Sequence, residues 1–239
     1  MRRIDLTLPL AEENLALDEA LLDEAEAAGV PCECLRLWEP SSPMVVVGRS
    51  SRVAVEVRQE RCRALGIPVL RRSSGGGAIV TGPGCLMYAV VLSLQSRPAL
   101  RAIDSAHRFV LESMAAALRR QGLAVEHSGT SDLTLDNRKF SGNSLRVRRE
   151  HLLYHGTLLY DFDVDLIGAC LGSPPRQPEY RAGREHPSFV TNLPLTAAVL
   201  RRLVAGAWGV DEAETDWPRE RVAELVAAKY SRREWNSRY

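Results

Sequence analysis

The chain has 239 residues and a formal net charge of +1, with 45% hydrophobic and 26% charged residues. This length and composition suit one large globular domain, and no shift in composition marks a boundary, so we expect residues 1–239 to form a single domain. The balanced charge favours neither nucleic acid nor a membrane as partner, and the longest apolar run, near residues 86–94, is too short to span a bilayer.

Apolar residues at helical spacing predict helices over residues 13–27, 57–65, 103–120, 163–171, 195–207 and 219–230. Shorter apolar runs predict strands over residues 34–38, 44–47, 69–70, 78–80, 87–94, 124–126, 131–135, 139–147 and 152–162. The last three strands follow one another without a helix, which implies antiparallel pairing. We therefore expect an α+β fold with a mainly antiparallel mixed sheet flanked by helices. Residues 172–187, rich in proline, arginine and glycine, are predicted to form a long loop.

The predicted strand at residues 69–70 runs into two arginines, two serines and three glycines, from Arg71 to Gly77. Successive glycines let an anion approach backbone N–H groups, and an arginine can add a bidentate contact to the same anion. The pattern is not a P-loop, and Val80 stands where a dinucleotide-binding turn needs a glycine. We therefore predict an anion-binding loop, with a flexible connection as the alternative.

Lys139 is one of two lysines in a chain that is rich in arginine, and it lies in a polar stretch from Asn137 to Ser144. A lysine offers a compact point charge on a flexible stem, which suits the polarisation of one carbonyl or phosphate oxygen. Asp136 and Asn137 are typical turn residues, so we expect a hairpin that presents Lys139 at the start of its second strand. The alternative is an ordinary surface lysine in a hairpin.

An ordered set of short motifs extends over nearly the whole chain. The motifs are Asn14-Leu15-Ala16-Leu17-Asp18-Glu19, Leu37-Trp38-Glu39, Val47-Gly48-Arg49, Arg71 to Ala78, Gly129-Thr130-Ser131-Asp132-Leu133, Arg138-Lys139-Phe140-Ser141-Gly142, His155-Gly156-Thr157-Leu158-Leu159, Lys229-Tyr230 and Glu234-Trp235-Asn236. In this order they resemble the catalytic domain of lipoate-protein ligases, within the biotin/lipoate ligase and lipoyl/octanoyl transferase superfamily. The resemblance implies the fold of that catalytic domain.

The resemblance implies an enzyme that activates lipoate with ATP and Mg²⁺ to lipoyl-AMP. The enzyme would then pass the lipoyl group to a lysine of a lipoyl carrier domain, in an acyltransferase subunit or a glycine-cleavage H-type protein. A free carboxylate resists attack by an amine, and the mixed anhydride with AMP removes that obstacle. Because two anions must meet to form the anhydride, the site needs positive charge and oriented donors.

The resemblance also implies which residues do this work. Lys139 matches the lysine of the family's Lys-x-x-Gly motif, beside the acyl carbonyl and the α-phosphate. Asp132 matches an aspartate that could orient or deprotonate the attacking amine. The residues expected to bind substrate or nucleotide are Arg72, Ser74, Gly75, Gly76, Gly77, Ala78, Gly142, Asn143 and Ser144. We expect no metal ligands, and we interpret His155 as a satisfied core histidine, although the family keeps a His-Gly pair there.

The chain departs from the family pattern at a few positions. Thr81-Gly82 stands where many relatives have His-Asp, and Cys85 stands where an asparagine commonly contacts the ligand. Asn143 stands where a smaller residue is usual. We therefore expect that end of the pocket, and the details of the nucleotide contact, to be altered. Arg71 and Arg72 are adjacent on a strand, so only one of them can face the site.

An octanoyl or lipoyl transferase of the same fold is the main alternative, because it uses a cysteine nucleophile and needs no ATP. In such enzymes the cysteine lies shortly before the Lys-x-x-Gly motif, where residues 126–132 contain none. Cys85 is the remaining candidate, although a small buried thiol is the more ordinary interpretation. The five cysteines lack Cys-x-x-Cys spacing, which favours reduced thiols, and the N-terminus lacks a signal peptide, so we expect a cytoplasmic protein.

Many bacterial ligases of this kind carry an additional C-terminal domain that aids adenylation, and we expect this chain to lack it. The chain would then work as a single domain, need a small accessory ligase subunit, or transfer a preformed adenylate. A non-catalytic lipoyl-binding protein is a further alternative. The arginine-rich residues 146–149 are interpreted as a contact for an acidic carrier or as a solvated strand end.

Overall fold

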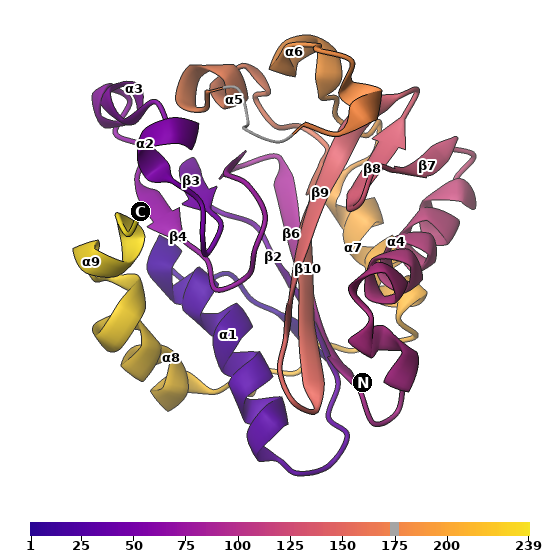
Figure 1. Ribbon diagram of the computed structural model, residues 1–239. Helices are drawn as coiled ribbons and strands as arrows, with labels where there is room; N and C mark the ends of the chain where they lie inside the picture. The colour runs from indigo at the N-terminus through magenta and orange to yellow at the C-terminus, as the bar shows by residue number, and fades with distance from the viewer. Residues whose placement is uncertain (173–176) are drawn as a thin grey trace.

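The computed structural model describes residues 1–172 and 177–239, and its centre is a seven-stranded sheet (Figure 1). The strand order is β1, β2, β6, β10, β9, β8, β7. Their bounds are β1 (Arg2–Asp5), β2 (Cys34–Trp38), β6 (Cys85–Ser93), β7 (Val125–Ser128), β8 (Asp132–Leu135), β9 (Arg138–Val147) and β10 (His151–Leu159). β1 and β2 run parallel and the other neighbouring pairs run antiparallel, so the predicted mainly antiparallel mixed sheet is confirmed.

A smaller sheet and a set of helices surround this centre (Figure 1). The smaller sheet has the order β4 (Val69–Arg71), β3 (Met44–Val47) and β5 (Ile79–Thr81). The helices are α1 (Ala11–Ala27), α2 (Val53–Glu56), α3 (Gln59–Ala64), η1 (Pro98–Arg101), α4 (Ile103–Arg119), α5 (Asp165–Cys170), η2 (Glu179–Arg181), α6 (His186–Phe189), α7 (Ala197–Ala207), α8 (Arg219–Leu225), η3 (Val226–Tyr230) and α9 (Arg233–Asn236). Within the described residues, none of these helices has the length and apolar character needed to cross a bilayer.

Side-chain alternation along the central strands divides the core into two parts. On β10, Leu153 packs into the cluster that contains α1 and the smaller sheet, whereas Leu152 and Tyr154 pack into the cluster that contains α4 and α7. The same period of two places His155 and Thr157 on the α1 side. The functional residues of β10 therefore lie between the two sheets and α1.

Local sequence patterns are sufficient to predict several of these helices and strands. The strands at residues 34–38 and 44–47 have their predicted bounds, five of the six predicted helices have bounds within two residues of observed ones, and the helix predicted over 219–230 is divided into α8 and η3. β1 and the single-turn helices α2, α6 and α9 were missed because so few residues cannot display a period. The loop predicted over residues 172–187 includes 173–176, which lie outside the described residues, and its remainder contains η2 and the start of α6.

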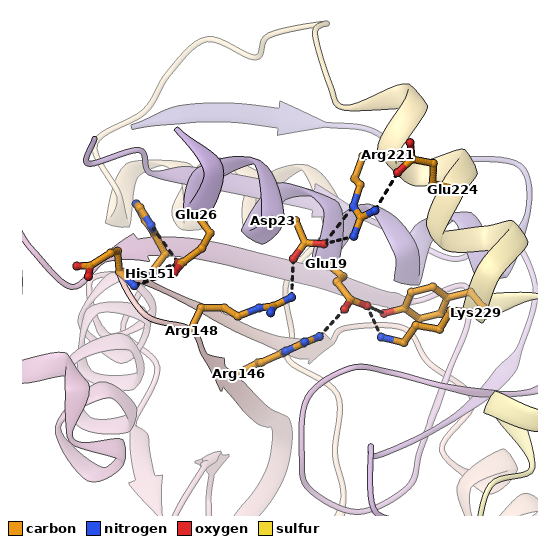
Figure 2. Close-up of polar contacts among 11 residues, drawn as sticks. Glu19, Asp23, Glu26, Arg146, Arg148, His151, Arg221, Glu224 and Lys229 are labelled. Carbon is orange, nitrogen blue, oxygen red and sulfur yellow. Dashed lines mark hydrogen bonds and ion pairs between the residues drawn. The ribbon is translucent and has the colours of Figure 1, made fainter. Parts of the chain in front are cut away.

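Ion pairs tie α1 to the β9–β10 hairpin and to the C-terminal helices (Figure 2). Glu19 pairs with Arg146 at 2.5 Å and with Lys229 at 2.6 Å, and Asp23 pairs with Arg148 at 2.7 Å. Two arginines of the 146–149 stretch therefore bind α1 rather than solvent. Arg149 is the one whose side chain is largely exposed, at 89%.

Candidate functional site

A cavity of about 480 Å³ lies between the α1 side of the central sheet and the smaller sheet. Three segments contribute its polar wall: residues 72–78, which we call the glycine loop, strands β9 and β10, and residues 177–189, which we call the covering segment. The covering segment includes α6, and Figure 1 shows α6 beside α5 at one end of the molecule. The cavity thus brings together parts of the chain that are far apart in sequence.

A β-bulge places Lys139 in this cavity. Asp132 is paired with Gly142 across β8 and β9, but Thr134 is paired with Lys139, so β9 has one extra residue in this interval. The extra residue puts Lys139 and Gly142 on the same side of the strand as Asp132. A Cβ at Gly142 would lie 2.9 Å from both Cε and Nζ of Lys139. The glycine of the Lys-x-x-Gly motif therefore makes room for the lysine side chain.

Asp132 is held from two sides. Its Oδ1 lies 2.7 Å from Lys139 Nζ, and its Oδ2 accepts a hydrogen bond of 2.7 Å from the Tyr180 hydroxyl. Burial and the Asp132 carboxylate both raise the pKa of Tyr180, so the phenol stays protonated and remains a donor. The two predicted catalytic residues are therefore in contact, and the covering segment supplies a third group that sequence reasoning did not identify.

The carbonyls of the glycine loop are bound by side chains. Gly75 O accepts from Ser144 Oγ at 2.8 Å, Gly76 O accepts from Ser51 Oγ at 3.0 Å, and Gly77 O accepts from Arg72 Nη2 at 2.9 Å. In a trans peptide the carbonyl and the following N–H point in opposite directions. The N–H groups of Gly76 and Gly77 are thus directed away from these partners, and the described residues offer them no acceptor.

Two further contacts define this loop. The Ala78 N–H donates to Glu56 Oε2 at 2.8 Å, so this predicted binding residue has its backbone donor occupied. Gly48 lies directly under the loop, because a Cβ there would be 1.8 Å from Gly76 O. The loop is therefore held in a fixed position at the wall of the cavity.

Arg72 and Arg71 point in different directions, as expected for neighbours on a strand. Arg72 lines the cavity, but its guanidinium donates to Val46 O, Gly75 O and Gly77 O, so it orders the loop. Burial lowers the pKa of Arg72 to about 10. Arg71 instead binds carbonyls on both sides of β4, including Gly48 O at 2.7 Å and Trp235 O at 2.9 Å, and so fastens the C-terminal segment.

A buried relay connects α1 to the glycine loop. Arg36 Nη1 lies 2.6 Å from Asp18 Oδ1, Asp18 Oδ2 lies 3.0 Å from His155 Nδ1, and His155 Nε2 lies 2.6 Å from Ser74 Oγ. Burial alone would raise the pKa of Asp18, but Arg36 and His155 outweigh it and hold that pKa below its ordinary value. His155 thus connects the Asp18 carboxylate to the Ser74 hydroxyl through its two ring nitrogens.

The position of His155 differs in one respect from the prediction that it is a satisfied core histidine. The histidine is satisfied by partners, as expected, yet it also lines the cavity and fixes Ser74, which accepts from Arg72 Nε at 3.0 Å. The sequence does hold one indication of this contact, which is the aspartate at position 18 among apolar helix residues, because a buried charge needs a partner. The identity of that partner depends on contacts across 137 residues of sequence.

The residues that follow Lys139 have separate tasks. Gly142 N–H donates to Thr157 Oγ1 at 3.2 Å, and Ser144 holds the glycine loop. The Asn143 side chain accepts from Tyr88 Oη at 2.5 Å and donates to Ser131 O at 2.8 Å, so it fixes the turn before Asp132. A Cβ at Gly156 would lie 1.8 Å from Asn143 Oδ1, which explains how the larger residue fits. Contact of these three with a nucleotide stays a prediction.

The other end of the cavity is apolar, with walls formed by Leu15, Trp38, Val80, Met87 and Leu159. Thr81 and Cys85 are fully buried behind Met87, since Thr81 Oγ1 lies 3.1 Å and Cys85 Sγ lies 3.8 Å from its sulfur. Burial raises the pKa of the Cys85 thiol to about 12. Thr81 and Cys85, two of the residues that differ from the family pattern, therefore do not line the cavity, whereas Asn143 does, and the apolar walls suit a slender aliphatic chain.

The described residues contain no group of three or more His, Cys, Asp or Glu side chains arranged to hold a metal ion. The polar end of the cavity offers the Lys139 ammonium, the Asp132 carboxylate and backbone N–H donors, beside an apolar channel. This arrangement can hold an acyl chain with its carboxylate next to a phosphate and a cation.

Known proteins resemble this chain in sequence and in fold. Residues 11–200 match the family described as lipoyl protein ligase A/B catalytic domain. Lipoate-protein ligase LplJ of Bacillus subtilis is 29% identical over 66% of this chain and 45% of that protein, and octanoyltransferase LipM of Carboxydothermus hydrogenoformans is 27% identical over 95% of this chain and 94% of that protein. The chain spans about half the length of several ligase relatives that it matches.

Two solved structures share the fold. The bi-partite lipoate protein ligase of Thermoplasma acidophilum, described with its E2 lipoyl domain, has a TM-score of 0.81 at 24% identity and covers 99% of this chain and 95% of its own. A lipoate-protein ligase A bound with ATP has a TM-score of 0.80 at 22% identity and covers 99% of each chain. The predicted fold is confirmed, and the chain belongs to the lipoyl protein ligase A/B catalytic-domain family.

Proposed function

We propose that this protein is a lipoate-protein ligase that activates lipoate with ATP and transfers the lipoyl group to a lysine of a lipoyl carrier domain. The observation that carries the proposal is the contact of 2.7 Å between Lys139 and Asp132, at the point where the apolar channel meets the glycine loop. A cation, a carboxylate and backbone donors thus meet where an acyl carboxylate would end.

In the first step, an oxygen of the lipoate carboxylate attacks the α-phosphorus of ATP. The new O–P bond gives lipoyl-AMP, and the bond between the α-phosphorus and the bridging oxygen breaks, so pyrophosphate leaves with the electron pair. Lys139 would neutralise the oxygens of both reactants, and the N–H groups of Gly76 and Gly77 would donate to the phosphate. Mg²⁺ would arrive as part of the Mg·ATP substrate.

In the second step, the carrier lysine attacks the acyl carbonyl, and AMP leaves as the amide forms. The amine must lose a proton, and Asp132 is the carboxylate placed to accept it or to orient the amine. Lys139 and Tyr180 occupy its two oxygens before substrate binds. Binding of the adenylate would draw Lys139 toward the phosphate and release Oδ1 for the amine.

A transferase that uses Cys85 is less well supported, although a relative named as an octanoyltransferase covers most of the chain. Cys85 is fully buried, burial raises its pKa to about 12, and no cysteine is among the described residues that line the cavity. A nucleophilic thiol needs exposure and a lowered pKa. We propose that residues 1–239 form one catalytic domain, working alone or with a small accessory ligase subunit.

The test combines purified protein, lipoate, Mg·ATP and an apo lipoyl domain, with AMP release and carrier mass followed together. We expect acylated carrier and AMP in equal amounts, and we expect Lys139→Ala to reduce adenylation by at least about 10²-fold without unfolding the protein. Normal ligation by Lys139→Ala would refute the role of the lysine. Acylation from an octanoyl carrier without ATP would instead identify a transferase.

A further inference from the structure

The charged and titratable side chains of the cavity differ in whether they have partners. Those with partners are Asp18, Glu56, Arg72, Asp132, Lys139 and His155, and each is bound to a neighbouring side chain or backbone group. Two residues of the covering segment, His186 and Arg181, differ from them, and of these two Arg181 is the one that always carries a charge. Its Nε donates to Arg184 O at 2.8 Å, but the described part of the chain provides no acceptor for Nη1 or Nη2.

Arg181 is nevertheless buried, with an exposed fraction of 5%. Its guanidinium carbon lies 4.7 Å from the centre of the Phe189 ring, which fixes the plane of the group without accepting its N–H bonds. Its two terminal nitrogens are not among the buried polar atoms that lack a partner, so they are open to solvent in a residue that lines the cavity, and an anion can reach them there. The guanidinium is therefore held in place at the wall of the cavity.

The surroundings of Arg181 are positive. Arg181 follows Tyr180, whose hydroxyl binds Asp132, and Asp132 in turn binds Lys139. His186 of the same segment also lines the cavity, and burial together with Arg181 and Lys139 lowers its pKa. Asp132 is the carboxylate within this group, so the polar end of the cavity has an excess of cations that suits a polyanion.

We propose that Arg181 binds the β- and γ-phosphates of ATP and stabilises pyrophosphate as it leaves, which rests on the proposed ligase function. Lys139 would take the α-phosphate, and Arg181 lies next along the polar wall through Tyr180 and Asp132. When the bond between the α-phosphorus and the bridging oxygen breaks, the electron pair goes to that oxygen, and the guanidinium meets the developing charge. Arginine suits this task because its planar fork binds two phosphate oxygens at once.

The experiment separates the two half-reactions of the purified full chain. Lipoate-dependent exchange of labelled pyrophosphate into ATP reports adenylation, and transfer from synthetic lipoyl-AMP to an apo lipoyl domain contains no pyrophosphate. We expect Arg181→Gln to lower kcat/KM for ATP in the exchange by about 10²-fold and to leave transfer within about twofold of the parent. Arg181→Lys should recover part of the exchange, because it restores the charge without the fork.

Arg120→Gln is the matched control, since Arg120 is an exposed arginine at the end of α4, outside the cavity, and should leave both half-reactions unchanged. Equal losses of exchange and transfer in Arg181→Gln would overturn the proposal by showing that Arg181 only supports the covering segment. A rise in KM for lipoate alone would overturn it in favour of a carboxylate site. An unmodified protein that transfers from lipoyl-AMP but shows no exchange would refute ATP-dependent activation itself, a failure visible without any variant.

Discussion

The glycine loop and the covering segment line the same cavity, but they contribute to it in opposite ways. The loop contributes backbone, and its carbonyls are bound by Ser51, Arg72 and Ser144. The covering segment contributes side chains, and Arg181 has two nitrogens without partners in the described chain. The hydrogen bonds of the glycine loop are in place without a ligand. The covering segment instead has a charged side chain whose free nitrogens an anionic ligand could bind.

The difference has a structural origin. The loop is bound by side chains or carbonyls of β3, α2, β9 and β10, with Gly48 below it, so its conformation is fixed by many elements. The covering segment is bound to β8, β9 and the turn between them through fewer contacts, which are those of Tyr180 with Asp132, Arg184 with Asn137 O, and Arg138 with Pro187 O. Changes beneath the loop should therefore affect chemistry strongly.

The largest effect is expected from Gly48→Ala. The added Cβ would lie 1.8 Å from Gly76 O, so the glycine loop would have to move away from residue 48. A displacement near 1 Å can cost about 10²-fold in rate, and we expect that loss in kcat/KM for adenylation. Gly206→Ala is the control, because no atom lies within 4 Å of its Cβ and the change sits inside α7, where alanine stabilises a helix by about 1 kcal/mol. Equal activity of the two variants would contradict the tight seating of the loop.

The second effect concerns the relay behind the loop. Asp18→Asn would leave Arg36 buried without a carboxylate, which typically costs about 3–5 kcal/mol in the free energy of unfolding. Denaturant unfolding at neutral pH would measure that loss. Asp23→Asn, on the same helix, breaks more exposed pairs with Arg148 and Arg221 and should cost about 1 kcal/mol or less. Similar losses in both variants would exclude a special role for the buried pair.

The pH dependence of the same variant has a definite sign. The pKa of Asp18 is held below its ordinary value of about 3.9, so its stabilising contribution is present above that pH and is lost as pH falls toward the lower folded value. The parent should therefore lose stability on acidification below about pH 4, in a range where Asp18→Asn loses less. Parallel unfolding curves for the two proteins would show that another carboxylate dominates acid unfolding.

The sequence predicted the parts of this site that depend on local pattern. Strand bounds at residues 34–38 and 44–47, and the turn at Asp136 and Asn137, follow from short apolar runs and turn chemistry, and both turn residues have positive φ. The family motifs assigned Lys139 and Asp132 roles near the same acyl group, and the structure adds that the two side chains are in contact. Geometry then added the reason for the motif's glycine, which is the space that Lys139 needs.

The remainder depended on contacts that no short pattern encodes. The bulge in β9 reverses the expected facing of residues after Lys139, and the Asp18–His155 contact joins residues 137 positions apart. Arg181 was missed because its segment resembles a loop, and Ala182 adopts φ +49, a conformation usually left to glycine. Such features arise from packing among distant elements, which decides what each side chain faces.

The smallest effect is expected from Cys85→Ser. Cys85 is fully buried behind Met87, and burial raises its pKa to about 12, so the thiol stays protonated and has no path to substrate. The serine is close in size, and we expect ligation within about twofold of the parent, with a modest loss of stability of about 1 kcal/mol from burial of the hydroxyl. Mass spectrometry of the protein incubated with an octanoyl carrier should detect no acyl thioester. A large loss of activity together with a captured thioester would instead move the chemistry from the Lys139 end of the cavity to its apolar end.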